Sequence, residues 1–177
     1  MKNNRQAQQE LYNRFVYMMK GICLRYAQNE VEAEDILQEA FIRIFKNLNS
    51  YSSTGPLGAW ARKITVNMAL EQYRKNKAQK NLTVVYDMKE ANPLVEDGAI
   101  EQLSLEDLLV KIQNLPVGFR TVFNLYAVEG YNHQEIGQLL DIAEGTSKSQ
   151  YSRARILLRQ MLEEEIKELN KNLNYAK

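Results

Sequence analysis

The sequence contains few residues that interrupt helices, form crosslinks or bind metals. Its 177 residues include 8 glycines, 3 prolines, 1 cysteine and 1 histidine. Because glycine and proline are the strongest helix breakers, we expect a largely helical chain. A single cysteine excludes an internal disulfide, and one cysteine with one histidine argues against a zinc cluster. Cys23 lies in the apolar run 18–24 and is interpreted as a small buried hydrophobic residue rather than a reactive thiol.

Long hydrophobic runs are also absent. The polar N-terminus leads into no apolar stretch of the signal-peptide type. No segment approaches the roughly 20 consecutive apolar residues that a membrane span needs. We therefore expect a cytoplasmic protein without a membrane span, and nothing in the sequence points to a cofactor or a small-molecule substrate.

Charge of one sign does not dominate the whole chain, but it dominates parts of it. The net charge is only +1, yet residues 30–39 carry acids without any lysine or arginine. Residues 62–80 are basic apart from Glu71, residues 87–107 are acidic apart from Lys89, and residues 148–159 are basic without an acid. Such alternation indicates surfaces for partners of opposite charge. The alternative is that solvated helix faces happen to cluster.

The first half has the apolar spacing of three helices. Residues 8–28 form the first, and the second carries one apolar stripe from Ile36 to Leu48 behind an acidic first turn. Residues 49–56 are rich in serine and end in Gly55-Pro56, which predicts a loop. A third helix is predicted from about Leu57 to about Lys77.

Two small helical domains are predicted, joined by an acidic linker. Residues 81–100 have no helical period and contain Pro93, Gly98 and several acids, as expected of a flexible linker. The fold class is therefore all-α, with domains at 1–80 and 101–177. Within the second domain, a helix covers about 101–114, and Pro116 begins another that Gly130 ends.

Residues 131–160 have the pattern of a helix-turn-helix. His133 to Leu140 is a short helix, 141–145 is a tight turn in which Ile142 fills the angle, and Thr146 is the predicted N-cap of a second helix that runs to about Gln160. The polar face of that second helix carries Lys148, Ser149, Gln150, Ser152, Arg153, Arg155 and Arg159.

This polar face suits duplex DNA. An α-helix fits the major groove, where arginine can pair with guanine and glutamine with adenine. Lysine, serine and the backbone N–H groups at a helix start can bind phosphate. The alternative is an ordinary helical hairpin with a polar outer face.

Several stretches together resemble one family. In the second half they are Leu115-Pro116-x-x-Phe119-Arg120-x-Val122-Phe123, Glu129-Gly130-Tyr131-x-His133-x-Glu135-Ile136-Gly137-x-x-Leu140 and Gly145-Thr146-Ser147-Lys148-Ser149-Gln150-x-x-Arg153-Ala154-Arg155. In the first half they are Glu34-Asp35-Ile36-Leu37-Gln38-Glu39-Ala40-Phe41 and Trp60-x-x-Lys63-Ile64-x-Val66-Asn67. The first set resembles the fourth conserved region of bacterial sigma-70 family factors, in the extracytoplasmic-function group. The second set is similar to that family's polymerase-binding and promoter-melting segments.

The resemblance, which covers roughly residues 8–80 and 101–162, implies a non-catalytic transcription initiation factor. Its partners would be core RNA polymerase, promoter DNA and, by family analogy, an anti-sigma protein. Contacts to core polymerase are expected from Asp35, Gln38, Glu39 and Phe41. Contacts to the melted promoter strand are expected from Trp60, Arg62, Lys63 and Asn67, with a flipped base captured by the loop 52–58. Contacts to the upstream promoter element are expected from Thr146, Lys148, Ser149, Gln150, Ser152, Arg153 and Arg155.

Three features depart from the family's commonest pattern. Ser147 stands where many relatives have valine, Gln150 where many have arginine, and Gly55-Pro56 where the capture loop often has an acidic or small polar residue. Since Gln150 and the loop lie where bases are read, the promoter sequence is not predicted. Taken without the family, Trp60 is equally well explained as a core residue and Asn67 as an exposed one.

Two other functions are alternatives to this interpretation. A free-standing helix-turn-helix repressor or activator would need a dimerisation seam or an effector domain, and it leaves the 34–41 and 60–67 stretches unexplained. An enzyme would need the acids between Glu30 and Glu39 to form a metal site, and the sequence has no glycine-rich phosphate loop to support that interpretation. Neither alternative accounts for both halves of the chain.

Overall fold

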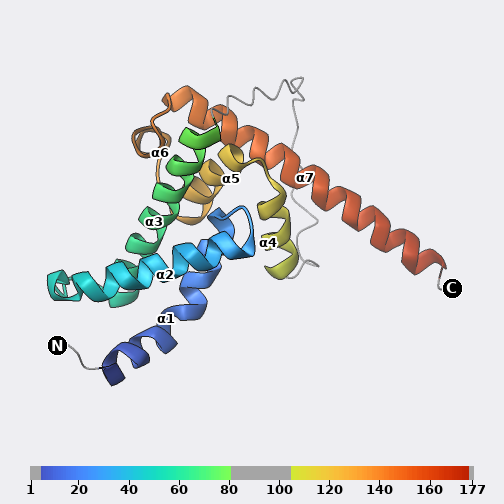
Figure 1. Cartoon of the computed structure of the whole chain (residues 1–177). Helices are drawn as coiled ribbons and strands as arrows, with labels where there is room; N and C mark the ends of the chain where they lie inside the picture. The colour runs from blue at the N-terminus through green and yellow to red at the C-terminus, as the bar shows by residue number, and fades with distance from the viewer. Residues whose placement is uncertain (1–4, 81–104, 176–177) are drawn as a thin grey trace. The chain divides into compact units, whose positions relative to one another are not determined.

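The computed structural model describes residues 5–80 and 105–175, and all their regular elements are helical. The chain divides into two units, Met1–Leu82 and Thr83–Lys177, which are described separately below. Figure 1 shows the helices of each. The all-α fold with two helical domains is confirmed. The predicted linker, 81–100, lies outside the described residues, and the bounds 1–80 and 101–177 stay a prediction.

Unit 1 is a three-helix bundle. Helices α1 (Arg5–Tyr26), α2 (Glu30–Asn47) and α3 (Leu57–Lys80) each pack against the other two, and the short 3-10 helix η1 (Leu48–Ser50) follows α2. The side chains of the core include Met19, Ile22, Cys23, Ala33, Ile36, Ala40, Ile44, Val66 and Leu70. The predicted stripe of the second helix therefore faces the core. Cys23 is buried as expected, and burial raises the pKa of its thiol to about 12.

Helix α2 begins where the sequence changes from apolar to acidic. Asn29 is its N-cap, because the Asn29 side chain accepts a hydrogen bond from the Glu32 backbone N–H at 2.9 Å. Glu30 and Glu32 lie in the first turn, where negative charge is favoured by the helix dipole. The acidic block therefore both starts this helix and supplies its exposed charge.

Unit 2 contains α4 (Leu105–Asn114), α5 (Val117–Phe123), the π-helix η2 (Asn124–Val128), α6 (His133–Leu140) and α7 (Glu144–Tyr175). Pro116, which was predicted to begin a helix, is the N-cap of α5 and lies one residue before it, and Gly130, with φ of +80°, follows η2. Its hydrophobic core joins α4, α5 and α7 through Ile112, Leu115, Phe119, Ala154 and Leu158. A half-buried ion pair between Lys111 and Glu165, 2.6 Å long, also ties α4 to α7.

The helix-turn-helix is formed by α6 and α7. Helix α6 has the predicted bounds and starts with a reciprocal capping box between Asn132 and Glu135. It ends at Asp141, whose φ of 53° turns the chain sharply. Gly137 permits a very close approach, since a Cβ atom there would lie 2.8 Å from the Ile142 carbonyl oxygen.

Two predictions about the second helix of this motif are wrong. Helix α7 begins at Glu144, so Thr146 lies inside its first turn and is not its N-cap. The turn is also shorter than the predicted 141–145, because it spans only residues 141–143 and begins with Asp141 in the left-handed conformation. Helix α7 also continues past Gln160 to Tyr175, and its C-terminal part extends beyond α4 (Figure 1).

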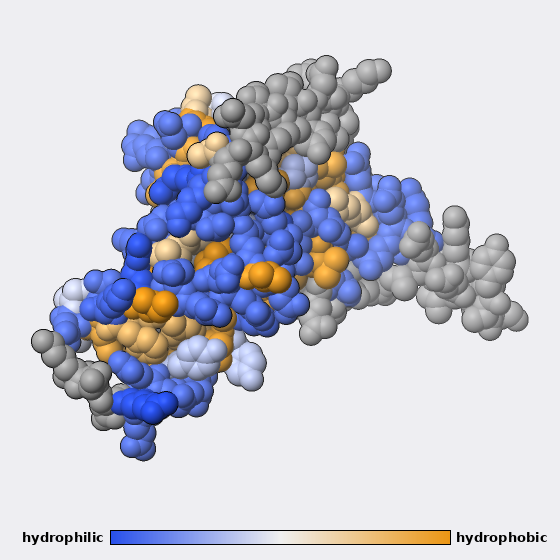
Figure 2. Space-filling model, in the orientation of Figure 1, coloured by the Kyte–Doolittle hydropathy of each residue, from blue (hydrophilic) through white to orange (hydrophobic). Residues whose placement is uncertain are grey.

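Figure 2 shows hydrophilic residues over much of the visible face, with hydrophobic residues in smaller patches among them. None of the helices in the described part of the chain is long and apolar enough to cross a membrane.

Candidate polymerase and DNA interfaces

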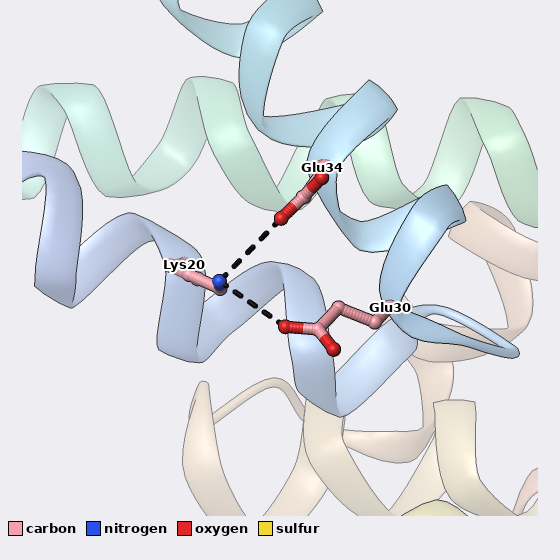
Figure 3. Close-up of polar contacts among 3 residues, drawn as sticks. All are labelled: Lys20, Glu30 and Glu34. Carbon is pink, nitrogen blue, oxygen red and sulfur yellow. Dashed lines mark hydrogen bonds and ion pairs between the residues drawn. The ribbon is translucent and has the colours of Figure 1, made fainter.

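Three acids at the start of α2 are engaged within unit 1. The Lys20 ammonium on α1 lies 3.3 Å from a carboxylate oxygen of Glu30 and 3.6 Å from one of Glu34 (Figure 3). The hydrogen bond to Glu30 raises the pKa of Lys20. The third acid, Glu32, accepts hydrogen bonds from Gln72 at 3.2 Å and Asn76 at 2.6 Å, which joins α2 to the basic end of α3.

The next acids along α2, Asp35 and Glu39, are not engaged in this way. Asp35, Gln38 and Glu39 are exposed, and their spacing of three and four residues places them on one helix face. Within the described residues, Asp35 and Glu39 form no ion pair. This face therefore presents negative charge that unit 1 does not neutralise.

Exposed apolar side chains stand beside this acidic face. Val31 is 70% exposed and Ile42 is 45% exposed, and both lie on α2. Position 42 follows Asp35 by seven residues and Gln38 by four, so Ile42 shares their face. Neither residue was predicted from the sequence as a contact, although an apolar residue outside the apolar stripe of α2 was a usable signal.

Phe41 does not lie on this surface. It is only 4% exposed, and its ring centroid is 4.6 Å from that of Tyr12 and 5.9 Å from that of Phe45. The contact between the rings of Tyr12 and Phe41 packs the buried face of α2 against α1. Phe41 can therefore support the exposed acids but cannot touch a partner directly in this conformation.

Three of the four residues predicted to contact the melted strand lie on the same side of α3. Trp60, Lys63 and Asn67 are spaced by three and four residues and share one side of α3, with Lys63 and Asn67 exposed. Arg62 is about 200° around the helix axis from Trp60, because successive residues turn by about 100°. It is half-buried and lies on another side of α3.

The loop before α3 is held closed by an aromatic residue. Tyr51 donates a hydrogen bond from its hydroxyl to the Gly55 carbonyl oxygen, and its ring centroid is 5.5 Å from that of Trp60. Between these ends, Ser52, Ser53 and Thr54 are exposed, and the hydroxyls of Ser52 and Thr54 are 3.0 Å apart. Trp60 is half-buried, so it both packs and offers part of its surface.

Most of the predicted upstream-element residues lie on the outer surface of α7. The exposed ones are Thr146, Lys148, Ser149, Ser152, Arg153 and Arg155. Lys148 forms an ion pair of 2.7 Å with Glu144, and the hydrogen bond to Lys148 lowers the pKa of Glu144. The Arg155 guanidinium lies 5.9 Å from the ring centroid of Tyr151. The surface is thus basic, and the positive charge of Lys148 is paired with Glu144.

Gln150 is the exception. Its amide faces α5, because a Cβ atom on Gly118 would lie 3.6 Å from Gln150 Oε1 and 3.7 Å from Nε2. Gln150 Oε1 is buried and accepts no hydrogen bond in the described part of the chain. A role in reading a base therefore requires this side chain to turn outward.

A buried polar contact joins the two helices of the motif. His133 Nδ1 lies 2.9 Å from the hydroxyl of Ser147, which is fully buried in the first turn of α7. The His133 ring also stacks on Tyr126, with centroids 4.3 Å apart and planes at 12°. His133 starts α6, as predicted, and its side chain is half-buried.

Metal binding has no support in the described residues, where no three histidine, cysteine or acidic side chains gather in a group that could hold an ion. Among the described residues, the predicted contact residues include an acidic surface on α2 and a basic surface on α7.

Comparisons with known proteins assign a family description to each unit. The family model for sigma-70 region 2 matches residues 11–79. The model for sigma-70 region 4 matches residues 105–158. The first covers α1 to α3, and the second covers α4 to the middle of α7.

Similar proteins are found along most of the chain. The ECF RNA polymerase sigma factor SigW of Bacillus subtilis is 31% identical over 163 residues, which is 86% of this chain and 86% of that protein. The factor SigE of Mycolicibacterium smegmatis is also 31% identical over 160 residues, which is 86% of this chain and 60% of that protein. Among solved structures, the sigma factor RpoE of Bartonella quintana, in complex with the anti-sigma factor NepR, has a TM-score of 0.51 at 21% identity over 88% of this chain and 96% of that one, a likeness of fold.

Proposed function

Because the chain belongs to the extracytoplasmic-function group of RNA polymerase sigma factors, and so directs the polymerase to promoters, we propose that its two units divide this task. Residues 1–80 bind core polymerase and the melted promoter strand. Residues 101–177 read the upstream element as duplex DNA, and 81–100 link the two. The observation that carries this proposal is the separation of an uncompensated acidic face in unit 1 from a basic helix-turn-helix surface in unit 2.

The docking face for core polymerase is formed by Asp35, Gln38 and Glu39. Their exposure and the absence of an ion pair at either acid within the described residues suit a partner helix that carries lysine or arginine. Ile42, 45% exposed beside them, adds an apolar anchor at the edge of the charges. Phe41 contributes by packing beneath this face.

The melted strand lies along Trp60, Lys63 and Asn67. A half-buried indole offers a surface for base stacking, and Lys63 is positioned to neutralise backbone phosphate. The loop 52–58 captures the flipped base. Arg62 lies on another side of α3 from Trp60, Lys63 and Asn67. It therefore adds positive charge near the DNA strand but does not contact the strand alongside them.

The upstream duplex is bound by α7. Arg153 and Ser149 can reach base edges in the major groove, while Thr146, Lys148, Ser152 and Arg155 hold the flanking phosphates. Gln150 joins the base-reading group only if its amide leaves α5. The His133–Ser147 contact at 2.9 Å fixes the start of α7 relative to α6, and so fixes the angle at which α7 enters the groove.

The remaining features of the proposal rest on the family. The factor acts in the cytoplasm, where the polymerase is, and it performs no catalysis itself. An anti-sigma protein is a further proposed partner, as in the NepR complex of the Bartonella quintana factor. Its binding would have to cover at least one of the two charged surfaces to block initiation.

Run-off transcription tests this function. Core RNA polymerase is incubated with genomic DNA fragments from the same host, with and without the full chain. Discrete new transcripts that are lost with Asp35→Arg are the expected result, and their start sites identify the promoters. The absence of transcripts, together with specific retardation of DNA by the chain alone, would contradict the proposal and favour a free-standing repressor or activator.

A further inference from the structure

We propose that Tyr51 is a positioning residue that closes residues 51–55 into a preformed loop, and that base selectivity in the melted strand depends on this closure. The inference rests on the proposed function of unit 1 and adds Tyr51, which is not among the predicted contacts to the melted strand. In this proposal the loop residues 52–54 and Trp60 contact the base, and Tyr51 holds them in place.

The hydroxyl of Tyr51 ties together the ends of two helices. The Tyr51 backbone N–H donates to the Leu48 carbonyl at 3.3 Å, which places Tyr51 at the end of η1. Its side chain donates to the Gly55 carbonyl, one residue before Pro56. The Pro56 carbonyl in turn accepts from the Ala59 and Trp60 backbone N–H groups at 3.0 and 3.2 Å, which begins α3. A single hydrogen bond therefore fixes the span between η1 and α3.

The residues inside this closure are well suited to contact a base. Ser52, Ser53 and Thr54 are all exposed, and a hydroxyl can both donate and accept hydrogen bonds. Ser53 has a φ of 57°, a left-handed conformation that a non-glycine residue adopts only when its surroundings hold it there. Space next to Gly55 is open, since a Cβ atom there would have no neighbour within 4 Å.

The ring of Tyr51 also contacts Trp60, the aromatic residue on the α3 side of the loop. Its centroid lies 5.5 Å from that of Trp60, with the planes tilted by 49°. This contact restricts the indole, which is the aromatic surface available for stacking. Tyr51 thus holds both the hydroxyl-bearing loop and the stacking residue, and ordering them before DNA arrives reduces the entropy lost on binding.

The test removes only the hydroxyl. Tyr51→Phe keeps the ring against Trp60 but deletes the hydrogen bond to Gly55. Tyr17→Phe is the matched control, because it makes the same chemical change at a tyrosine that is 88% exposed on α1 of the same unit. Each full-length variant is assembled with core polymerase and titrated with fluorescent single-stranded oligonucleotides that carry the non-template promoter strand. Every base of the melted element is substituted in turn, so that the wild-type holoenzyme reveals the captured position.

The expected result is a loss of discrimination at one position. With Tyr51→Phe, affinity for the preferred base falls about fivefold, the factor that corresponds to ~1 kcal/mol, a typical net value for one hydrogen bond. The four bases at that position become more nearly equal, while discrimination at the other positions, the melting temperature and the affinity for upstream duplex stay as in Tyr17→Phe.

Unchanged discrimination with Tyr51→Phe would overturn the inference. So would an equal loss at all positions accompanied by a lower melting temperature, which is what a purely structural role produces. If the wild-type holoenzyme discriminates at no position, the proposed function of unit 1 fails as well, and this outcome is distinct from one in which the wild type discriminates and the variant matches it.

Discussion

In unit 1 the candidate binding residues stand on the outer faces of long helices, whereas in unit 2 they depend on the turn between α6 and α7. Asp35, Glu39 and Lys63 are exposed on α2 and α3, and none of them forms an ion pair within the described residues. The basic face of α7 is instead oriented by Gly137, which lets the turn approach α6 closely, and by the buried hydroxyl of Ser147. The first surface should therefore tolerate structural change better than the second.

Gly137→Ala is expected to have the largest effect, and only on unit 2. The added methyl would lie 2.8 Å from the Ile142 carbonyl oxygen, which is backbone and cannot move away alone. Overpacking of this kind should destabilise unit 2 by about 2 kcal/mol. Urea unfolding followed by circular dichroism measures the change, while fluorescence of Trp60, the only tryptophan, reports unit 1 alone.

Gly145→Ala is the matched control, since a Cβ atom there meets nothing within 4 Å. Alanine in the first turn of α7 should be neutral or slightly stabilising. Two results would contradict this explanation of why unit 2 is the more sensitive unit. One is an equal loss of stability in the two variants. The other is unfolding of unit 1, followed by Trp60 fluorescence, at a lower urea concentration in Gly137→Ala.

Asp35→Asn is expected to weaken binding to core polymerase about tenfold, because charge-assisted hydrogen bonds are typically worth ~1.5–3 kcal/mol. Glu30→Gln removes the same charge from the same helix, but Glu30 is already 3.3 Å from the Lys20 ammonium, so its loss should change affinity less than about twofold. Competition with a labelled wild-type chain for core polymerase gives both values. Equal losses of affinity in the two variants would show that binding to core polymerase depends on the total charge of α2 and not on the exposed face that contains Asp35.

Glu144→Gln should have the smallest effect and the opposite sign. Glu144 holds Lys148 at 2.7 Å and places a negative charge beside the DNA-binding face. Its removal frees one positive charge, so affinity for upstream duplex should rise about twofold and the salt dependence should steepen by up to about one counterion. Because the hydrogen bond and charge of Lys148 lower the pKa of Glu144, the pair is lost at a lower pH than the one at which an unpaired glutamate is protonated.

Fluorescence anisotropy across a salt series measures the effect of Glu144→Gln. Glu163→Gln, an exposed change farther along α7, is the control for net charge. A decrease in affinity with Glu144→Gln would indicate that the ion pair is needed to orient Lys148.

The comparison also explains which features could be predicted from the sequence. Helical periodicity located α2, α3 and α6, because apolar side chains at intervals of three and four must face a core. The same periodicity places Phe41 in the apolar stripe, whereas the family resemblance implied that Phe41 contacts the polymerase. When a family motif and a burial pattern disagree, the structure here follows the burial pattern.

The features that escaped prediction depend on the backbone or on tertiary contacts. Gly145 and Thr146 have the composition of a turn, but Asp141 adopts the left-handed conformation that makes it, and asparagine or aspartate does so less often than glycine. The inward direction of Gln150, whose amide lies against Gly118 of α5, depends on a contact between residues far apart in sequence. The contact between His133 and Ser147 likewise joins residues whose spacing has no local signature.

The division of work between the units can be tested most directly with two DNA probes and two variants. Holoenzyme that carries Lys63→Ala or Arg153→Ala is titrated with a single-stranded oligonucleotide of the melted element and, separately, with upstream duplex. The account predicts that Lys63→Ala weakens only the single-stranded complex and Arg153→Ala only the duplex complex, each by about fivefold. If both variants weaken both complexes to the same extent, the two units do not divide recognition, and the central claim is wrong.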